Sequence, residues 1–186
     1  SLFAIPEYLQ KMVEKGMLGS KTGKGFFFKD RTSPKGDILS LDLKTLETKS
    51  LWQRDENVTG PRVSPDGKKL GFWMAGPEGG LHLLDLACGG LRRIAKVPGP
   101  QSHGLGGGSF AWSPDGRFLV SAGQDHKAII WNTETGVMDT GLAAHTDNVV
   151  AVAWSPDGTR IATASWDDTA RIWDRDGTLR VTLTGH

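Results

Sequence analysis

SPDGTRIATASWDDTARIWD, residues 155–174, is the stretch that decides the fold of this chain. It opens with Ser-Pro-Asp-Gly and ends with Trp-Asp, and a matching stretch, residues 113–132, begins 42 residues earlier. A further Ser-Pro-Asp-Gly begins at Ser64. A turn signal and a strand-end tryptophan that recur together at this spacing make an internal repeat, which constrains the fold more than any other feature of the chain.

Each regular repeat predicts four short strands, because runs of β-forming residues alternate with Gly, Pro and Asp turn residues. In the last repeat the expected strands are 149–154, 160–164, 169–173 and 179–183, and in the repeat before it 109–112, 117–122, 127–131 and 137–140. Four strands in about 42 residues is the pattern of a β-propeller blade.

The repeat that begins at Ser64 is less regular. Its expected strands include 69–73 and 81–85, with a longer Gly/Pro loop between them, and Phe72 stands where the regular repeats have Ser121 and Thr163. Further upstream, residues 38–42 and 47–51 fit the outer half of another blade.

We therefore predict a mainly β fold: a partial β-propeller of about three and a half four-stranded blades, with a short N-terminal helix. Residues 1–36 are expected to form a separate helix-turn segment, and residues 37–186 the propeller. The expected blades are a half blade at 37–54, a degenerate blade at 55–100, and regular blades at 101–142 and 143–186.

The expected helix spans residues 6–15. Pro6 suits a first helical position, Leu9, Met12 and Val13 share one face, and Gly16 provides a stop. Residues 6–26 also resemble the C-terminal stretch of 3-hydroxyacyl-CoA dehydrogenases, where a Met-Val-Glu-x-Gly helix end precedes Gly-x-Lys-Thr-Gly-x-Gly-Phe. The resemblance covers about residues 2–30 and includes neither the nucleotide-binding half nor the catalytic His–Glu pair of that family. A helix and turn that cover a propeller edge are the alternative interpretation.

Composition narrows the range of functions. The chain has 22 Lys and Arg against 21 Asp and Glu, so nothing in its charge points to nucleic acid or an anionic membrane. No apolar run approaches the length of a membrane span. Cys88 is the only cysteine, which favours a reducing compartment, and we expect a cytoplasmic protein. The Ser-Leu-Phe start and the Thr-Gly-His end read as the limits of a piece of something longer, or of a composite.

Residues 101–186 closely resemble the WD-repeat family, and the resemblance continues less closely from about residue 55. In that family, a His before the first strand, a Ser or Thr in the second, an Asp in the following turn and the Trp of the third strand form a hydrogen-bonded tetrad. The resemblance implies two structural tetrads in this sequence: His103, Ser121, Asp125 and Trp131, and His145, Thr163, Asp167 and Trp173. The degenerate repeat lacks the tetrad, and its strand resembles propeller repeats of TolB-like proteins.

An Asp–His–Ser set also occurs in hydrolase triads, but two copies in register with the repeat favour a structural role. Lys21-Thr-Gly-Lys-Gly25 lacks the Ser or Thr that a phosphate loop requires. The five histidines show no ligand spacing, so we expect no catalytic, cofactor-binding or metal-binding residues and no cofactor.

The expected function is a non-catalytic scaffold for protein–protein interactions. Loops at the ends of the blades are the expected contact sites. Trp166 is the first candidate anchor for a partner, with packing against a blade as the alternative, and His126 and Gln124 are weaker candidates. Partner proteins, missing blades or a second copy are expected to pair with open blade edges. A remnant of a β-oxidation dehydrogenase and a composite without evolved function are the competing hypotheses.

Overall fold

The computed structural model describes residues 38–41, 48–52, 58–96 and 109–185. Contacts between residues divide the chain into two compact units, residues 1–58 and residues 59–186. In the first unit, β1 (Ile38–Leu41) and β2 (Thr48–Trp52) form a two-stranded antiparallel sheet. These two strands lie where the sequence predicted the outer half of a blade.

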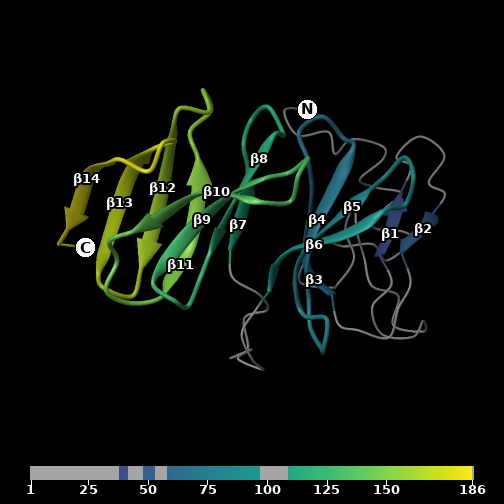
Figure 1. Ribbon diagram of the computed structural model, residues 1–186, viewed down its shortest axis with the longest axis horizontal. Coiled ribbons are helices and arrows are strands. Elements are labelled where there is room, and N and C mark those ends of the chain that lie inside the picture. Colours follow the sequence, from purple (N-terminus) through teal and green to yellow (C-terminus); the bar gives the residue numbers. More distant parts are fainter. Residues whose placement is uncertain (1–37, 42–47, 53–57, 97–108, 186) are drawn as a thin grey trace, which may run out of the picture. The chain divides into compact units, whose positions relative to one another are not determined.

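Three four-stranded sheets follow, each with its strands side by side in chain order (Figure 1). Blade 1 contains β3 (Val58–Val63), β4 (Lys69–Met74), β5 (Gly80–Asp85) and β6 (Leu91–Lys96). Blade 2 contains β7 (Phe110–Trp112), β8 (Phe118–Ala122), β9 (Lys127–Asn132) and β10 (Met138–Ala143). Blade 3 contains β11 (Val149–Trp154), β12 (Arg160–Ser165), β13 (Thr169–Asp174) and β14 (Leu179–Thr184).

The Ser-Pro-Asp-Gly tetrapeptides make the same turn in all three blades. In blade 3 the Ser155 hydroxyl donates to Asp157 (2.6 Å) and accepts the amide N–H of Arg160 (2.9 Å). Gly158 closes the turn with φ +71°, in the left-handed region that glycine adopts without strain. Equivalent serine–aspartate bonds of 2.6 Å occur at Ser64 and Ser113. The repeated tetrapeptide therefore fixes the connection between the first two strands of each blade.

The predicted mainly β, propeller-type fold is confirmed in the described part of the chain. All described elements are strands, and each expected strand pair of the regular repeats is present within a few residues. The sequence did not specify β3 and β6 of blade 1, which carry no tryptophan or turn motif. The expected helix at 6–15, the segment 1–36 and the dehydrogenase-like stretch lie outside the described residues.

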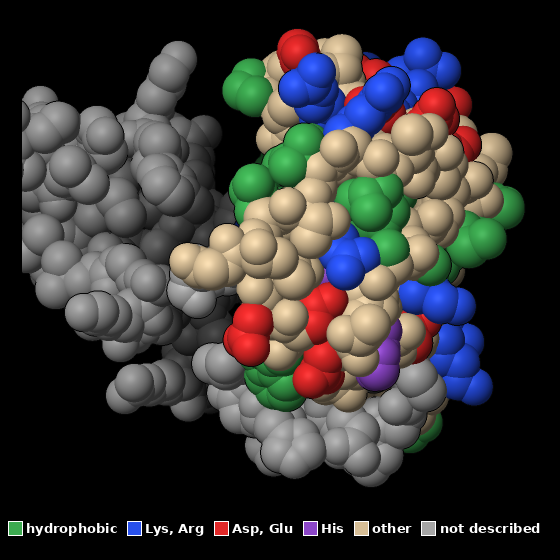
Figure 2. Space-filling model, turned by 90° about the vertical axis from the view of Figure 1, so that its left-hand side faces the viewer, with side chains coloured by type: hydrophobic (Ala, Val, Ile, Leu, Met, Phe, Trp, Pro, Cys, Tyr) green, Lys and Arg blue, Asp and Glu red, His purple; other side chains and the backbone are tan. Residues whose placement is uncertain are grey.

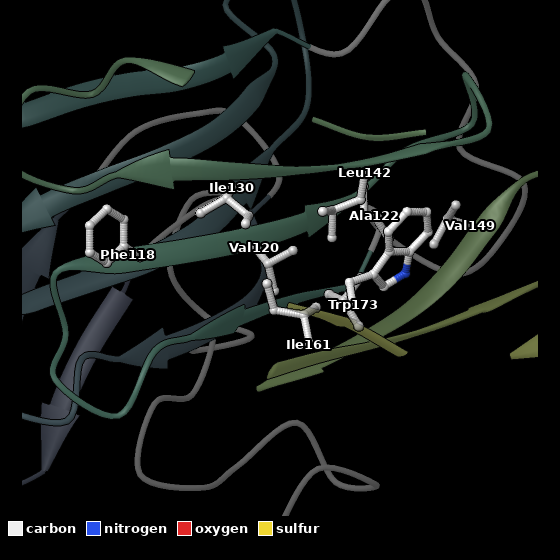
Figure 3. Packing of buried hydrophobic residues seen from close by; sticks show 10 residues of the cluster. Phe118, Val120, Ala122, Ile130, Leu142, Val149, Ile161 and Trp173 are labelled. Carbon is white, nitrogen blue, oxygen red and sulfur yellow. The ribbon is translucent and has the colours of Figure 1, made fainter. Parts of the chain in front are cut away.

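Apolar side chains pack between successive blades. Between blades 1 and 2, Trp73, Leu81, Leu83 and Ile94 meet Phe110 and Leu119. Between blades 2 and 3, a larger cluster includes Val120 and Ile161, which face one another, and Trp173 beside Ala122, Leu142 and Val149 (Figure 3). One face of each strand therefore points toward the neighbouring blade, which explains the alternation of apolar residues along the strands.

Candidate functional site

Four side chains of blade 3 form a continuous hydrogen-bonded chain. The indole N–H of Trp173 donates to the Thr163 hydroxyl (2.9 Å), and this hydroxyl lies 2.7 Å from Nε2 of His145. Nδ1 of His145 lies 2.9 Å from Oδ2 of Asp167. Every group is satisfied when Thr163 donates to Nε2 and the Nδ1–H donates to Asp167, so this arrangement selects one neutral tautomer of the imidazole.

The Asp167 carboxylate joins two loops at one end of blade 3. It lies in the turn between β12 and β13 and accepts the backbone N–H of Thr169 (3.1 Å) within that turn. It also accepts the backbone N–H of Thr146 (3.0 Å), which belongs to the connection from blade 2. Arg171 adds an ion pair at 3.7 Å. The chain of hydrogen bonds therefore holds the turn, the connection and the inner strands in one arrangement.

The hydrogen-bonded side chains Asp167, His145 and Thr163 lie beneath the surface of the blade. Thr163 is 2% exposed and His145 is 7% exposed, and the Thr163 hydroxyl is already engaged by two partners. A nucleophile must reach a substrate atom, and a hydroxyl beneath the blade surface cannot do so. The burial and the hydrogen bonds of the Asp–His–Thr set are those of a group that links the strands and loops of the blade.

Blade 2 shows part of the same arrangement. The indole N–H of Trp131 donates to the Ser121 hydroxyl at 2.8 Å, as its counterpart does in blade 3. Asp125 lies in the turn between β8 and β9, and His103 lies outside the described residues. The structure thus brings together two of the four residues that the resemblance implied for this blade.

Blade 1 uses an aromatic contact instead. Phe72 and His82 pair across β4 and β5, and their rings stack with centroids 5.9 Å apart. Both side chains are buried, and Nδ1 of His82 lies 3.1 Å from the carbonyl oxygen of Gly80. Phe72 takes the strand position of Ser121 and Thr163, while Leu84 pairs with Leu70 where Trp131 and Trp173 pair with Leu119 and Ile161, so blade 1 lacks the tryptophan hydrogen bond.

Trp166 projects from the same turn that carries Asp167. Its backbone N–H donates to the Asn148 carbonyl (3.0 Å), and its neighbour Ser165 is buried and donates to the Asp147 carbonyl (3.0 Å). Because the residues on both sides point inward, the indole points outward and is 63% exposed. In the part of the chain that the structure describes, the indole is not buried in a blade, and its role as a partner anchor stays a prediction.

The two weaker candidates lie in the equivalent turn of blade 2. His126 and Gln124 are both exposed, and His126 adopts φ +66°, the conformation that Asp168 has in blade 3. All three candidate contact residues therefore occupy turns between the second and third strands, Trp166 in blade 3 and the other two in blade 2.

Sequence reasoning missed a second group of residues, at the opposite ends of the strands. Lys69 donates to the Thr133 carbonyl (3.3 Å) and hydroxyl (3.2 Å) across the interface of blades 1 and 2. Phe118 and Arg160 occupy the same place in blades 2 and 3, five residues after the serine of each turn. The constant spacing of five residues from the serine is the sequence signal that could have identified these three positions.

Acid is expected to destabilise the fold through Asp167. Burial by itself raises the pKa of this carboxyl, but hydrogen bonds from Thr169, Thr146 and His145 outweigh burial and hold the pKa well below 3.8. Ionised Asp167 stabilises the folded state fully above pH 3.8, and this stabilisation is lost as the pH falls toward the lower pKa that the carboxyl has in the folded state. The pKa of Asp157 is lowered to about 2, mainly by the Ser155 hydroxyl, so protonation of Asp157 in acid also destabilises the folded state.

We therefore expect the unfolding temperature to fall between about pH 4 and pH 2, measured by circular dichroism. Asp167→Asn should flatten that slope, because the variant has no carboxyl to protonate at this position. An unchanged slope in the variant would remove Asp167 as a cause of acid sensitivity.

No cluster of three or more His, Cys, Asp or Glu side chains suited to a metal ion occurs in residues 38–41, 48–52, 58–96 and 109–185. Within the same ranges, no helix has the length and apolar character needed to cross a membrane.

Three consecutive four-stranded antiparallel sheets, with the same turn and packed face against face, define a protein of the β-propeller class. The family model for the WD domain, G-beta repeat, matches residues 103–132 and 137–174, so blades 2 and 3 are WD repeats. This match includes all eight residues of the two expected tetrads.

Two solved structures are similar in fold. "Structure of U3-55K" and "Crystal structure of RRP9 WD40 repeats" each superpose with a TM-score of 0.58 and 23% sequence identity over 73% of this chain. The chain covers 42% of the first and 41% of the second, so it spans about two fifths of the length of these relatives.

Proposed function

We propose that this chain is a non-catalytic scaffold that binds a protein partner through the end of the blades that carries Trp166. The observation that carries the proposal is a tryptophan that is 63% exposed on a turn held by a buried hydrogen-bonded chain. Exposed aromatic side chains on rigid supports are the residues that most often dominate protein interfaces, because little conformational entropy is lost when they bind. WD-repeat members are generally scaffolds, which supports this assignment.

Trp166→Ala is expected to weaken partner binding by about 2 kcal/mol, roughly 30-fold, and to leave the unfolding temperature within about 1 °C. Val137→Ala is the matched control, since Val137 is 62% exposed but lies at the opposite end of its blade. A photo-crosslinking residue at position 166 or 137 would first identify the partner, and calorimetry would then measure its affinity for each variant.

Equal loss of affinity in the two variants would contradict the proposed site, and so would crosslinks from position 137 alone. A crosslink from position 166 to nucleic acid, with none to protein, would contradict the proposed class of partner. A large loss of stability in Trp166→Ala would reassign the indole to the folded core.

The dehydrogenase hypothesis predicts a different result. The burial of the Asp–His–Thr set and the WD repeats support a scaffold, so we expect no NAD-dependent oxidation of a 3-hydroxyacyl-CoA by this chain. Absorbance at 340 nm would measure the reaction, and turnover above that of a heat-denatured sample would contradict the proposal.

A further inference from the structure

The turn that carries Trp166 is bound to the loop that leads into blade 3. The backbone N–H of Trp166 donates to the Asn148 carbonyl (3.0 Å), and the Ser165 hydroxyl donates to the Asp147 carbonyl (3.0 Å). Two hydrogen bonds between neighbouring residues on each side leave the two segments little freedom to separate. The backbone positions that present the Trp166 indole and the Asp147 carboxylate are therefore fixed relative to each other.

Two carboxylates on these segments have no cationic partner within the described ranges. Asp168 follows in the same turn, is exposed, and makes no side-chain hydrogen bond or ion pair with any residue that the structure describes. Oδ1 of Asp147 accepts the backbone N–H of Asn148 (2.6 Å), and no described residue binds its Oδ2. Arg171 does not neutralise either carboxylate, because it is half-buried and pairs with Asp167 (3.7 Å).

The end of blade 3 that carries this turn is locally acidic. In Figure 1, β12 ends and β13 begins at the lower edge of blade 3. Figure 2 shows Asp and Glu side chains gathered in the lower left of the face it displays, whereas Lys and Arg side chains lie mainly at the top and along the right edge. The whole chain has 22 Lys and Arg against 21 Asp and Glu, so the negative charge is a property of this end and not of the overall composition.

Blade 2 shows that the fold does not require this combination of residues. Its turn between the second and third strands has Gln124 and His126 where blade 3 has Trp166 and Asp168. The backbone is the same in both turns, since His126 has φ +66° and Asp168 has φ +57°. Only the aspartate between the two positions is common to both turns. The indole and the second carboxylate are therefore additions to a turn that forms without them.

An exposed indole beside two carboxylates favours a cationic ligand. The face of an indole attracts a cation more strongly than the ring of Tyr or Phe does. A purely apolar partner would cover the ring only by removing water from the carboxylates, and the carboxylates would repel a phosphate backbone. The guanidinium group meets both requirements, because its plane stacks on an aromatic ring and its fork of N–H donors binds carboxylate oxygens.

We propose that the Trp166 end binds an arginine side chain in an exposed segment of the protein partner, with the guanidinium stacked on the indole and its N–H groups donating to Asp168 and to Oδ2 of Asp147. Recognition of arginine rests on the proposed function, which requires only that Trp166 contact a protein. Trp166 supplies the contact area, and the two carboxylates select the charge of the ligand. Added salt should weaken the binding, because the carboxylates lie at the surface.

The test uses a fluorescein-labelled peptide in which arginine alternates with serine, and the same peptide with citrulline in place of arginine. Citrulline keeps the shape of the arginine side chain but has no charge. At low salt the arginine peptide is expected to bind the full chain, and the citrulline peptide should bind at least about 10-fold more weakly in fluorescence anisotropy. The indole N–H resonance of Trp166, identified by its loss in Trp166→Phe, should shift as the arginine peptide is added.

Asp168→Asn and Asp147→Asn are each expected to weaken binding of the arginine peptide by about 3- to 10-fold. Both variants should keep the fold, since asparagine adopts the left-handed backbone of position 168 and its side-chain oxygen can still accept the Asn148 N–H at position 147. Asp176→Asn is the matched control, because it removes an exposed carboxylate from the turn between β13 and β14, at the opposite end of the blade. The control should bind the arginine peptide as the original chain does.

Equal weakening in Asp176→Asn would reduce the binding to general charge attraction and overturn the proposal. Equal affinity for the citrulline peptide would also overturn it, and so would tighter Trp166-dependent binding of a single-stranded oligouridine. If the arginine peptide does not bind at all, the proposal is wrong, and a protein crosslinked from position 166 would then leave the proposed function standing. Absence of any protein crosslink from that position would remove both.

Discussion

Trp173→Ala is expected to lower the free energy of unfolding by about 4 kcal/mol, and the unfolding temperature by about 10 °C. The indole is 2% exposed and belongs to the cluster between blades 2 and 3, so its removal leaves a cavity between the blades. The same change removes the N–H donor to Thr163. Thermal unfolding followed by circular dichroism measures the effect.

Trp173→Phe separates the two causes. The phenyl ring keeps most of the buried volume but has no donor for the Thr163 hydroxyl, so the expected loss is about 1–2 kcal/mol. Trp166→Ala serves as the exposed tryptophan control, with almost no loss. A loss below about 1 kcal/mol for Trp173→Ala would mean that blade 3 does not depend on its packing against blade 2.

The sequence predicted the parts of the fold that local chemistry dictates. The Ser-Pro-Asp-Gly turn needs only its own serine, aspartate and glycine, so a four-residue motif locates the strands on either side of it. β3 and β6 were not predicted from the sequence, because they contain no motif of their own. Their positions depend on pairing with β4 and β5.

The candidate site was less accessible to sequence reasoning. The residues of the His145–Trp173 chain could be named from the repeat, but whether Trp166 is buried or exposed depends on the inward direction of Ser165 and Asp167. The interface roles of Lys69 and Phe118 could not be recognised at all, since their contacts with Thr133 and Arg175 lie between blades. Contacts between sheets are not encoded in the spacing within one repeat.

Asp167→Ala is expected to destabilise the protein by about 3 kcal/mol in the free energy of unfolding. The side chain is 5% exposed, and its removal leaves the backbone N–H groups of Thr146 and Thr169 without their acceptor. The Nδ1–H of His145 then keeps only the Thr169 hydroxyl, 3.3 Å away. Asp176→Ala is the control, because Asp176 is exposed and accepts one backbone N–H, that of Thr178. The control should lose much less stability than Asp167→Ala in urea unfolding.

A double-mutant cycle decides whether Asp167 acts through His145 or only through the two loop amides. If the chain from Trp173 to Asp167 is one unit, His145→Ala removes much of what Asp167 contributes, and the double variant should lose at least about 1 kcal/mol less than the sum of the single losses. If the losses add, Asp167 is only an acceptor for Thr146 and Thr169, and the imidazole contributes through its bond to Thr163. We expect coupling, since Asp167 selects the tautomer that leaves Nε2 free to accept from Thr163.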